Sequence, residues 1–188
     1  ILGSNVNPAE RTRTGISQKI AKKHEIAWKN IYSGIFRDLD EILLPIGIAE
    51  ENGRLPLKRG PKALQEKGIP YYHLTKKGIL VGLAINGIEN MPEQLKEFFS
   101  KSDPEEKEFE KIITKLMTTS PTFTYSIFQK YVKAFCENKI NELLPFDLSK
   151  LQNISDENLI IQKEILIAFL KLTSQEKKAA TVFLEKIA

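Results

Sequence analysis

A series of helix-start signals recurs through the second half of the chain and commits that half to helical structure. Five times after residue 86, a Ser, Thr, Asp or Asn is followed within three positions by Pro, Asp or Glu, the arrangement that caps a helix N-terminus. These starts fall at Asn90, Asp103, Ser120, Ser155 and Thr173. Because no segment between them alternates convincingly in the manner of a strand, residues 86–188 are predicted to be helical throughout.

The first half combines helical and strand-like segments. Residues 1–15 are polar and contain two glycines and a proline, which predicts an arm or linker. Two helical patterns follow, and Pro45 ends the second. The predicted elements are a helix over 16–23 with Ser17 as its N-cap, a helix over 27–44, a short strand over 53–57, a strand over 69–74 and a helix from Thr75 to about Ile85.

Composition excludes several kinds of site. The 188 residues include one cysteine, Cys136, and two histidines, so the chain forms neither an internal disulfide nor a cysteine-based zinc cluster, and we expect no metal. The sequence has no Gly-rich phosphate loop, no His-Glu-x-x-His motif and no nucleophile elbow, so we expect neither an enzyme nor a bound cofactor.

The longest uncharged run covers residues 78–88, which is too short for a membrane-spanning helix. We therefore expect a cytoplasmic protein without a membrane partner. Because the sequence begins at Ile1 instead of Met, we also expect it to be a processed chain or a piece of a longer one.

Charge is distributed unevenly along the chain. Residues 1–85 contain 14 Lys and Arg against 8 Asp and Glu, whereas residues 86–188 contain 14 against 16. This asymmetry favours a first half that faces a polyanion. A chance fluctuation over a segment of this length is the alternative explanation.

Three small or apolar residues early in the chain have a characteristic spacing. Ala21 is small enough for a second helix to cross closely, Ile26 is expected to pack inward after a turn, and Ile31 is expected to be buried by the second helix. This spacing resembles the helix-turn-helix family over about 25 residues. Glu25 departs from the pattern, because the turn position usually holds glycine, which adopts left-handed conformations readily.

The following segment extends the resemblance. A strand-like run, a basic loop and a second strand lead into Tyr72-His-Leu-Thr-Lys-Lys-Gly78, where Thr75 would cap the next helix. This ending resembles the close of the wing in winged helix regulators of the MarR/PadR kind. The resemblance implies a mainly α fold: a winged helix-turn-helix domain with a small β-hairpin wing over residues 16–85, then an all-helical region over residues 86–188 for dimerisation, effector or partner binding.

The resemblance implies a DNA-binding protein, a transcription regulator that inserts the helix from about Ala27 into the major groove of double-stranded DNA. The start of the preceding helix and the basic wing would hold phosphates. The candidate DNA-binding residues are Ser17, Gln18 and Lys19 on the first helix, Trp28, Lys29, Tyr32, Ser33 and Arg37 on the second, and Lys58, Arg59 and Lys62 in the wing. Arg11 and Arg13 are candidates for further phosphate contacts. The family also implies a homodimer, or a protein partner, through residues 86–188, and association with the nucleoid.

The same residues are compatible with two other functions. A winged helix also serves as a protein–protein interaction module within a larger complex, and four acidic residues near the second helix favour that function: Glu25, Asp38, Asp40 and Glu41. RNA binding would use the same cations, with Tyr71 and Tyr72 as stacking platforms. A continuous basic surface on the second helix and the wing would favour DNA, whereas acidic interruptions would favour a protein partner.

Overall fold

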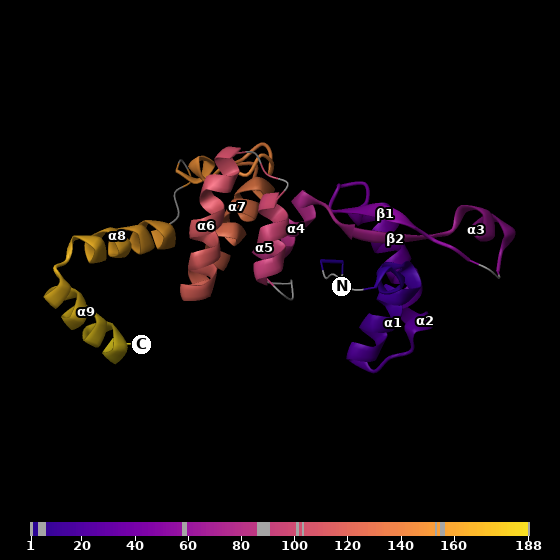
Figure 1. The fold of residues 1–188 in the computed structure, drawn as a ribbon, viewed down its shortest axis with the longest axis horizontal. Helices are drawn as coiled ribbons and strands as arrows, with labels where there is room; N and C mark the ends of the chain where they lie inside the picture. The colour runs from indigo at the N-terminus through magenta and orange to yellow at the C-terminus, as the bar shows by residue number, and fades with distance from the viewer. Residues whose placement is uncertain are drawn as a thin grey trace. The chain divides into compact units, whose positions relative to one another are not determined.

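The computed structural model describes residues 2–3, 7–57, 60–85, 91–100, 102, 104–152, 154 and 157–187. Its described part is mainly helical with a two-stranded antiparallel sheet, so the predicted mainly α fold class is confirmed (Figure 1). The 3₁₀-helices are η1 and η3, and η2 is a π-helix. The elements in chain order are η1 (Pro8–Arg11), α1 (Arg13–His24), α2 (Trp28–Arg37), η2 (Asp38–Leu43), β1 (Ala49–Leu55), α3 (Lys62–Lys67), β2 (Ile69–Leu74), α4 (Lys76–Ala84), α5 (Met91–Ser100), α6 (Pro104–Thr119), α7 (Pro121–Cys136), η3 (Leu148–Leu151), α8 (Glu157–Lys171) and α9 (Ser174–Ile187).

Two compact units make up the chain, residues 1–148 and residues 149–188. The division differs from the boundary that we expected near residue 85. The reason is that α4, the last element of the predicted winged helix domain, packs against α5 and α7. Leu80 and Leu83 on α4 are fully buried, so the hairpin and the following helices belong to one unit.

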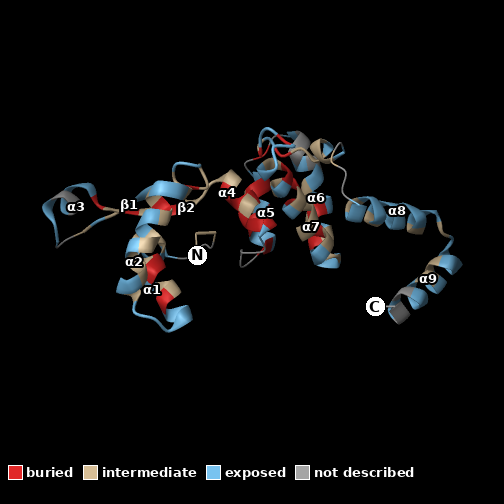
Figure 2. Cartoon of the chain, turned by 180° about the vertical axis from the view of Figure 1, so that it is seen from behind, coloured by how far each residue is buried: buried red, intermediate tan, exposed pale blue. Residues whose placement is uncertain are grey.

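Aromatic side chains form the centre of the helical part of the first unit. The ring of Phe98 contacts those of Phe99 and Phe146 edge to face, with centroids 5.0 and 5.6 Å apart. Phe146 also stacks on Phe128 and lies against Tyr131. The buried residues therefore concentrate on α4, α5 and α7 (Figure 2). Burying each such side chain contributes about 1.5–3 kcal/mol, which anchors α4 and the end of the hairpin that leads into it.

Residues 7–15, predicted as part of an arm, are folded. Asn7 caps η1, and Thr12 is buried and forms an isolated antiparallel bridge with Tyr71 of β2. Thr12 is also the N-cap of α1, because its hydroxyl oxygen accepts a hydrogen bond of 3.1 Å from the N–H of Gly15. The N-cap that we predicted, Ser17, is wrong: the helix begins four residues before it.

The turn between α1 and α2 adopts the left-handed conformation that the glycine rule requires, although it holds glutamate. Glu25 has φ 54° and ψ 37°, and its N–H donates to the carbonyl oxygen of Ala21. Ala21 is buried where α1 and α2 pack together. The helix-turn-helix spacing therefore produces two packed helices, with conformational strain concentrated at Glu25.

The predicted strand over residues 69–74 is confirmed as β2, whereas its partner β1 begins at Ala49, four residues before the predicted start. The register pairs Ala49 with Leu74, and a bulge lies between Glu51 and Arg54. β2 then leads into α4 as predicted.

The Thr-x-x-Gly sequence at the end of β2 has a clear structural cause. The hydroxyl oxygen of Thr75 accepts from the N–H of Gly78 at 3.0 Å and caps α4. The same hydroxyl donates to the carbonyl oxygen of Gly47 at 2.6 Å. A Cβ on Gly78 would overlap the carbonyl oxygen of Ile48, so only glycine fits at this close approach.

Candidate nucleic-acid interface

The early start of α1 removes one candidate residue from the surface. Ser17 lies in the second turn of α1, is fully buried, and donates a hydrogen bond of 2.8 Å to the carbonyl oxygen of Arg13. It therefore cannot hold a phosphate at the helix start, which corrects the prediction. Gln18 is exposed, and the ammonium group of Lys19 lies 3.2 Å from the carboxylate of Glu10. An exposed pair of this kind exchanges easily with a phosphate, because it contributes at most about 1 kcal/mol.

Three lysines gather around the left-handed turn. Lys22 and Lys23 lie in the last turn of α1 and Lys29 in the first turn of α2, all exposed. Among the described residues none of the three has an ion-pair partner. The N-cap of α2 is Ala27, which provides no side-chain cap. The N–H of Asn30 donates to the carbonyl oxygen of Ala27 at 3.0 Å, so the N–H groups of Trp28 and Lys29 are the ones left available in this turn. We call Lys22, Lys23, Lys29 and the start of α2 the turn cluster.

The aromatic residues at the start of α2 contact each other. The rings of Trp28 and Tyr32 meet edge to face with centroids 5.9 Å apart, and both side chains are half-buried. The adjacent Ile26 is 46% exposed, so the prediction that it packs inward is wrong. The N–H of Ile26 donates to the carbonyl oxygen of Ala21 at 3.0 Å, so the backbone of Ile26 belongs to the C-terminal cap of α1 while its side chain stays exposed.

Farther along α2, Ser33 and Arg37 are both exposed, as predicted for outward positions. The guanidinium of Arg37 lies 3.7 Å from the carboxylate of Asp38, and both side chains are at least half exposed. Solvent screens this pair, so it leaves Arg37 able to contact another group.

The hairpin tip contains a short helix, α3, within the segment that we predicted as a basic loop. Two of the wing candidates, Lys58 and Arg59, lie outside the described residues. Lys62 is described, with a side chain 91% exposed and its ammonium group 4.0 Å from Glu66. Lys67, which sequence reasoning did not single out, is exposed on the same helix without an ion-pair partner in the described part of the chain. No motif marks Lys67, because it follows the acidic Glu66 and is separated from the other cations of the segment.

Two arginines expected to contact phosphate have structural contacts instead. Arg13 forms an ion pair with Asp40, and its guanidinium lies over the rings of Phe36 and Tyr72 at 4.8 and 5.2 Å. The guanidinium of Arg11 lies 5.3 Å from the ring centroid of Tyr71. Arg13 therefore connects α1 to η2 and β2 and is not available to DNA.

The RNA alternative loses one of its platforms. Tyr72 is buried, and this burial raises the pKa of its hydroxyl, an effect that the positive charge of Arg13 partly opposes. A ring in this position cannot stack on a nucleotide base.

No family model matches the chain, and neither a curated protein nor a solved structure shows detectable similarity to it. Within the described residues, no helix has both the length and the apolar character needed to cross a membrane.

Proposed function

We propose that the chain binds double-stranded DNA through the turn cluster and the exposed face of α2, as a transcription regulator. The observation that carries this proposal is the gathering of Lys22, Lys23 and Lys29 around an uncapped helix start, without acidic partners among the described residues. Cations beside free N–H groups at a helix N-terminus suit phosphate oxygens. If α1 and α2 act as a helix-turn-helix, α2 would lie in the major groove while α1 crosses the phosphate backbone.

Within this proposal the candidate residues have different tasks. The turn cluster holds the phosphate backbone, and the exposed Gln18, Ser33 and Arg37 provide side chains for base edges or further phosphates. Lys62 and Lys67 on α3 give the hairpin tip a second set of cations. The acidic Glu25 lies inside the turn cluster and weakens its attraction for a polyanion.

The salt dependence of binding tests the proposal. Fluorescence anisotropy of a labelled random duplex, measured at several salt concentrations, should show affinity that falls linearly on a log–log scale, with a slope of about −3 or steeper. The triple variant Lys22/Lys23/Lys29→Ala should weaken binding and flatten the slope by about 2–3, because each phosphate contact contributes about 0.9. The triple variant Lys107/Lys111/Lys115→Ala on α6 removes the same charge from another exposed helix and should change neither. Absence of binding at low salt, or equal losses in both triple variants, would contradict the proposal.

A protein partner is the second candidate function, and a specific observation favours it. Phe36, Ile42 and Ile46, which follow one another along α2, η2 and the turn after it, are each 46–50% exposed. Large exposed apolar side chains suit a protein surface better than a phosphate backbone. If Phe36→Ser abolishes capture of a protein partner while the lysine triple variant does not, this function is supported over DNA binding.

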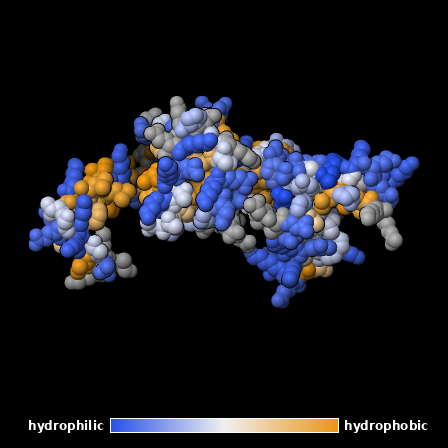
Figure 3. All heavy atoms as spheres, in the orientation of Figure 1, coloured by the Kyte–Doolittle hydropathy of each residue, from blue (hydrophilic) through white to orange (hydrophobic). Residues whose placement is uncertain are grey.

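The second unit supplies a partner surface for a homodimer. Helix α8 has no buried residue, and six of its large apolar residues are 41–74% exposed (Figure 3). These residues are Ile160, Ile161, Ile165, Leu166, Ile167 and Leu170. Helices that are apolar on nearly every face are normally covered.

The charges of α8 favour a second copy in antiparallel orientation. Glu157 and Lys171 lie at opposite ends of the helix, equally far from Glu164 and on the same face, at seven-residue spacing. Antiparallel pairing places Glu157 of each copy against Lys171 of the other, whereas parallel pairing opposes like charges at both ends. Light scattering after gel filtration should show a dimer that Glu157→Lys weakens and that the double variant Glu157→Lys/Lys171→Glu restores. A monomer at micromolar concentration, or a double variant no better than the single one, would contradict this arrangement.

A further inference from the structure

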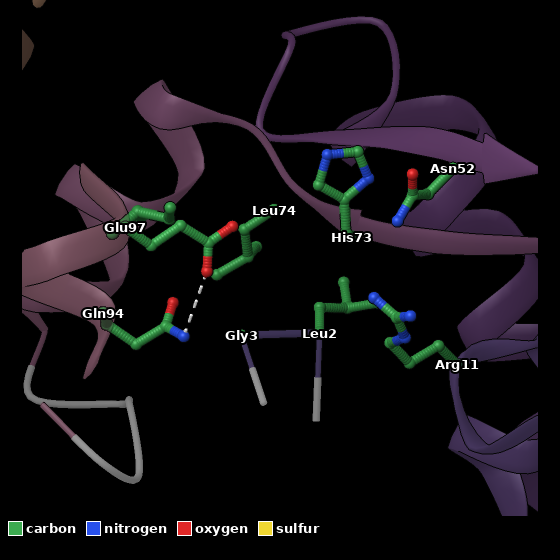
Figure 4. A pocket seen from close by; sticks show the side chains of 9 residues that line it. Leu2, Gly3, Arg11, Asn52, His73, Leu74, Gln94 and Glu97 are labelled. Carbon is green, nitrogen blue, oxygen red and sulfur yellow. Dashed lines mark hydrogen bonds between the residues drawn. The ribbon is translucent and has the colours of Figure 1, made fainter. Parts of the chain in front are cut away.

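The first unit holds its side chains in contact with one another even where it leaves a cavity. This cavity, of about 170 Å³, lies between the N-terminal segment, the hairpin and α5 (Figure 4). In its lining, Arg11 lies over the ring of Tyr71. The amide nitrogen of Gln94 donates to Glu97 at 3.5 Å on the side formed by α5. The second unit differs, because none of its described residues is buried.

The two helices of the second unit do not support each other. α8 and α9 do not pack along one another, and the ammonium group of Lys177 on α9 lies 5.8 Å from the ring centroid of Phe169 on α8. Val182 and Phe183, the large apolar residues described on α9, are 52% and 61% exposed. The six exposed apolar residues of α8 therefore have no cover within the described part of their own unit.

Local sequence alone does not stabilise α8. The helix has 15 residues, and isolated helices of about this length are only marginally stable in water. Four of its residues are isoleucine, whose β-branched side chain lowers helix propensity. The free energy that makes α8 helical must therefore come from burying its apolar side chains against a surface that the second unit does not itself provide.

A second copy of α8 offers such a surface, and the charges of the helix favour it. Antiparallel pairing joins Glu157 of each copy to Lys171 of the other. Glu164 lies seven residues from both, so the same pairing places Glu164 of one copy against Glu164 of the other at the centre. The pair therefore combines an attractive contact at each end with a repulsive contact in the middle.

We propose that α8 folds stably only when two copies pair, so that the folding of this helix and dimerisation are one step. The inference rests on the homodimer proposed above and is independent of DNA binding. In the monomer α8 exchanges between helix and coil, and the concentration of the chain determines how much of it is helical. The repulsion between the two Glu164 carboxylates raises the concentration that is required.

Hydrogen exchange of the full chain, read by mass spectrometry at about 0.1–100 µM, tests this coupling, and sedimentation measures the dimer fraction at the same concentrations. The amides of α8 should exchange roughly tenfold or more slowly in the dimer than in the monomer, and their protection should follow the dimer fraction. The amides of α4, which is packed in the core of the first unit, should stay protected at every concentration.

Variants test whether dimerisation and protection change together. Glu164→Gln removes the central repulsion and should shift both to lower concentration by the same factor. Glu185→Gln, which neutralises an exposed carboxylate on α9, should shift neither. Leu170→Asp replaces an apolar side chain that is 74% exposed in the single chain, so it should abolish both only if a second copy covers this position.

Each outcome bears on the coupling or on the homodimer. Protection of α8 at concentrations where sedimentation shows only monomer would refute the coupling and leave the homodimer intact. The coupling is equally wrong if the dimer forms while α8 stays unprotected, or if Glu164→Gln shifts the dimer fraction alone. If no dimer forms at the highest concentration, the homodimer and the coupling are both wrong.

Discussion

Glu25→Gly should stabilise the first unit by about 1 kcal/mol. Glu25 has φ 54°, a left-handed conformation that costs a residue with a Cβ about 1–2 kcal/mol relative to glycine. Glycine removes that cost, although its greater conformational freedom in the unfolded chain reduces the gain in stability by about 0.5–1 kcal/mol. The substitution also removes a carboxylate beside the C-terminal end of α1, where the helix dipole disfavours negative charge by about 0.3 kcal/mol. For a chain of this length the net gain corresponds to a rise in Tm of about 2–4 °C.

Urea unfolding followed by the fluorescence of Trp28 measures this effect. Trp28 is the single tryptophan and lies three residues after Glu25, so its signal follows the unit that contains the turn. The midpoint should rise without a change in the m-value. Asn138→Gly is a matched control: Asn138 has φ 56°, but asparagine tolerates this conformation, so its gain should be below about 0.5 kcal/mol.

Glu25→Ala separates the two causes, because alanine removes the charge and keeps the Cβ. Its gain should be no more than the few tenths of a kcal/mol that the charge accounts for. The reasoning is refuted if Glu25→Gly leaves the midpoint unchanged or lowers it, or if Glu25→Ala stabilises the protein as much as Glu25→Gly does.

Three further predictions concern the cores and one helix cap. Phe98→Ala should destabilise the first unit by about 3–5 kcal/mol, because Phe98 is fully buried among aromatic rings, and calorimetry should show a lower Tm for that unit. Asp40→Ala leaves the guanidinium of Arg13 half-buried without its carboxylate and should cost about 1–3 kcal/mol in urea unfolding; a cycle with Arg13→Met should recover part of this loss, and strict additivity would contradict the pairing. Hydrogen bonds from the hydroxyl and then the backbone N–H of Thr173 lower the pKa of Glu176 below its ordinary value of 4.5. Because the folded pKa is the lower one, this cap contributes above about pH 4.5 and is lost as the pH falls through the folded pKa. Circular dichroism of the wild-type chain should therefore show some loss of helix as the pH falls through this range. The Glu176→Gln variant should lack that part of the loss.

Elements whose signals lie within one helical turn could be predicted from the sequence. The Thr75 cap and the Thr173–Glu176 capping box form the hydrogen bonds that their spacing predicts. β2 covers the predicted residues 69–74, and α7 begins after Ser120 at Pro121 as expected. In the two caps the residues that make the interaction are three positions apart, so the chain needs no distant partner to form them, whereas β2 pairs with β1.

The candidate site could be predicted only in part. Lys29, Ser33 and Arg37 lie on the outward face of α2, because amphipathic spacing alone determines which side of a helix faces water. Ser17 was placed on the surface by the same local reasoning and is buried, since Thr12 and not Ser17 caps α1. Thr12 acts as the cap because it bridges to β2, a strand almost 60 residues farther along the chain.

Sequence by itself determined most of the helices of the second half, the hairpin strand β2, the caps at Thr75 and Thr173 and the uneven charge, but it did not predict that residues 137–147 are not helical. Tertiary structure decided the rest. It placed Arg13 between Asp40 and two aromatic rings and packed α4 against α5 and α7 instead of against the helices before it. It also formed the cavity that both Arg11 and Gln94 line. The physical reason is the distance along the chain between the residues that interact. Capping and periodicity depend on neighbours within a turn, whereas burial and pairing depend on which distant surfaces meet, and a single sequence does not specify that choice locally.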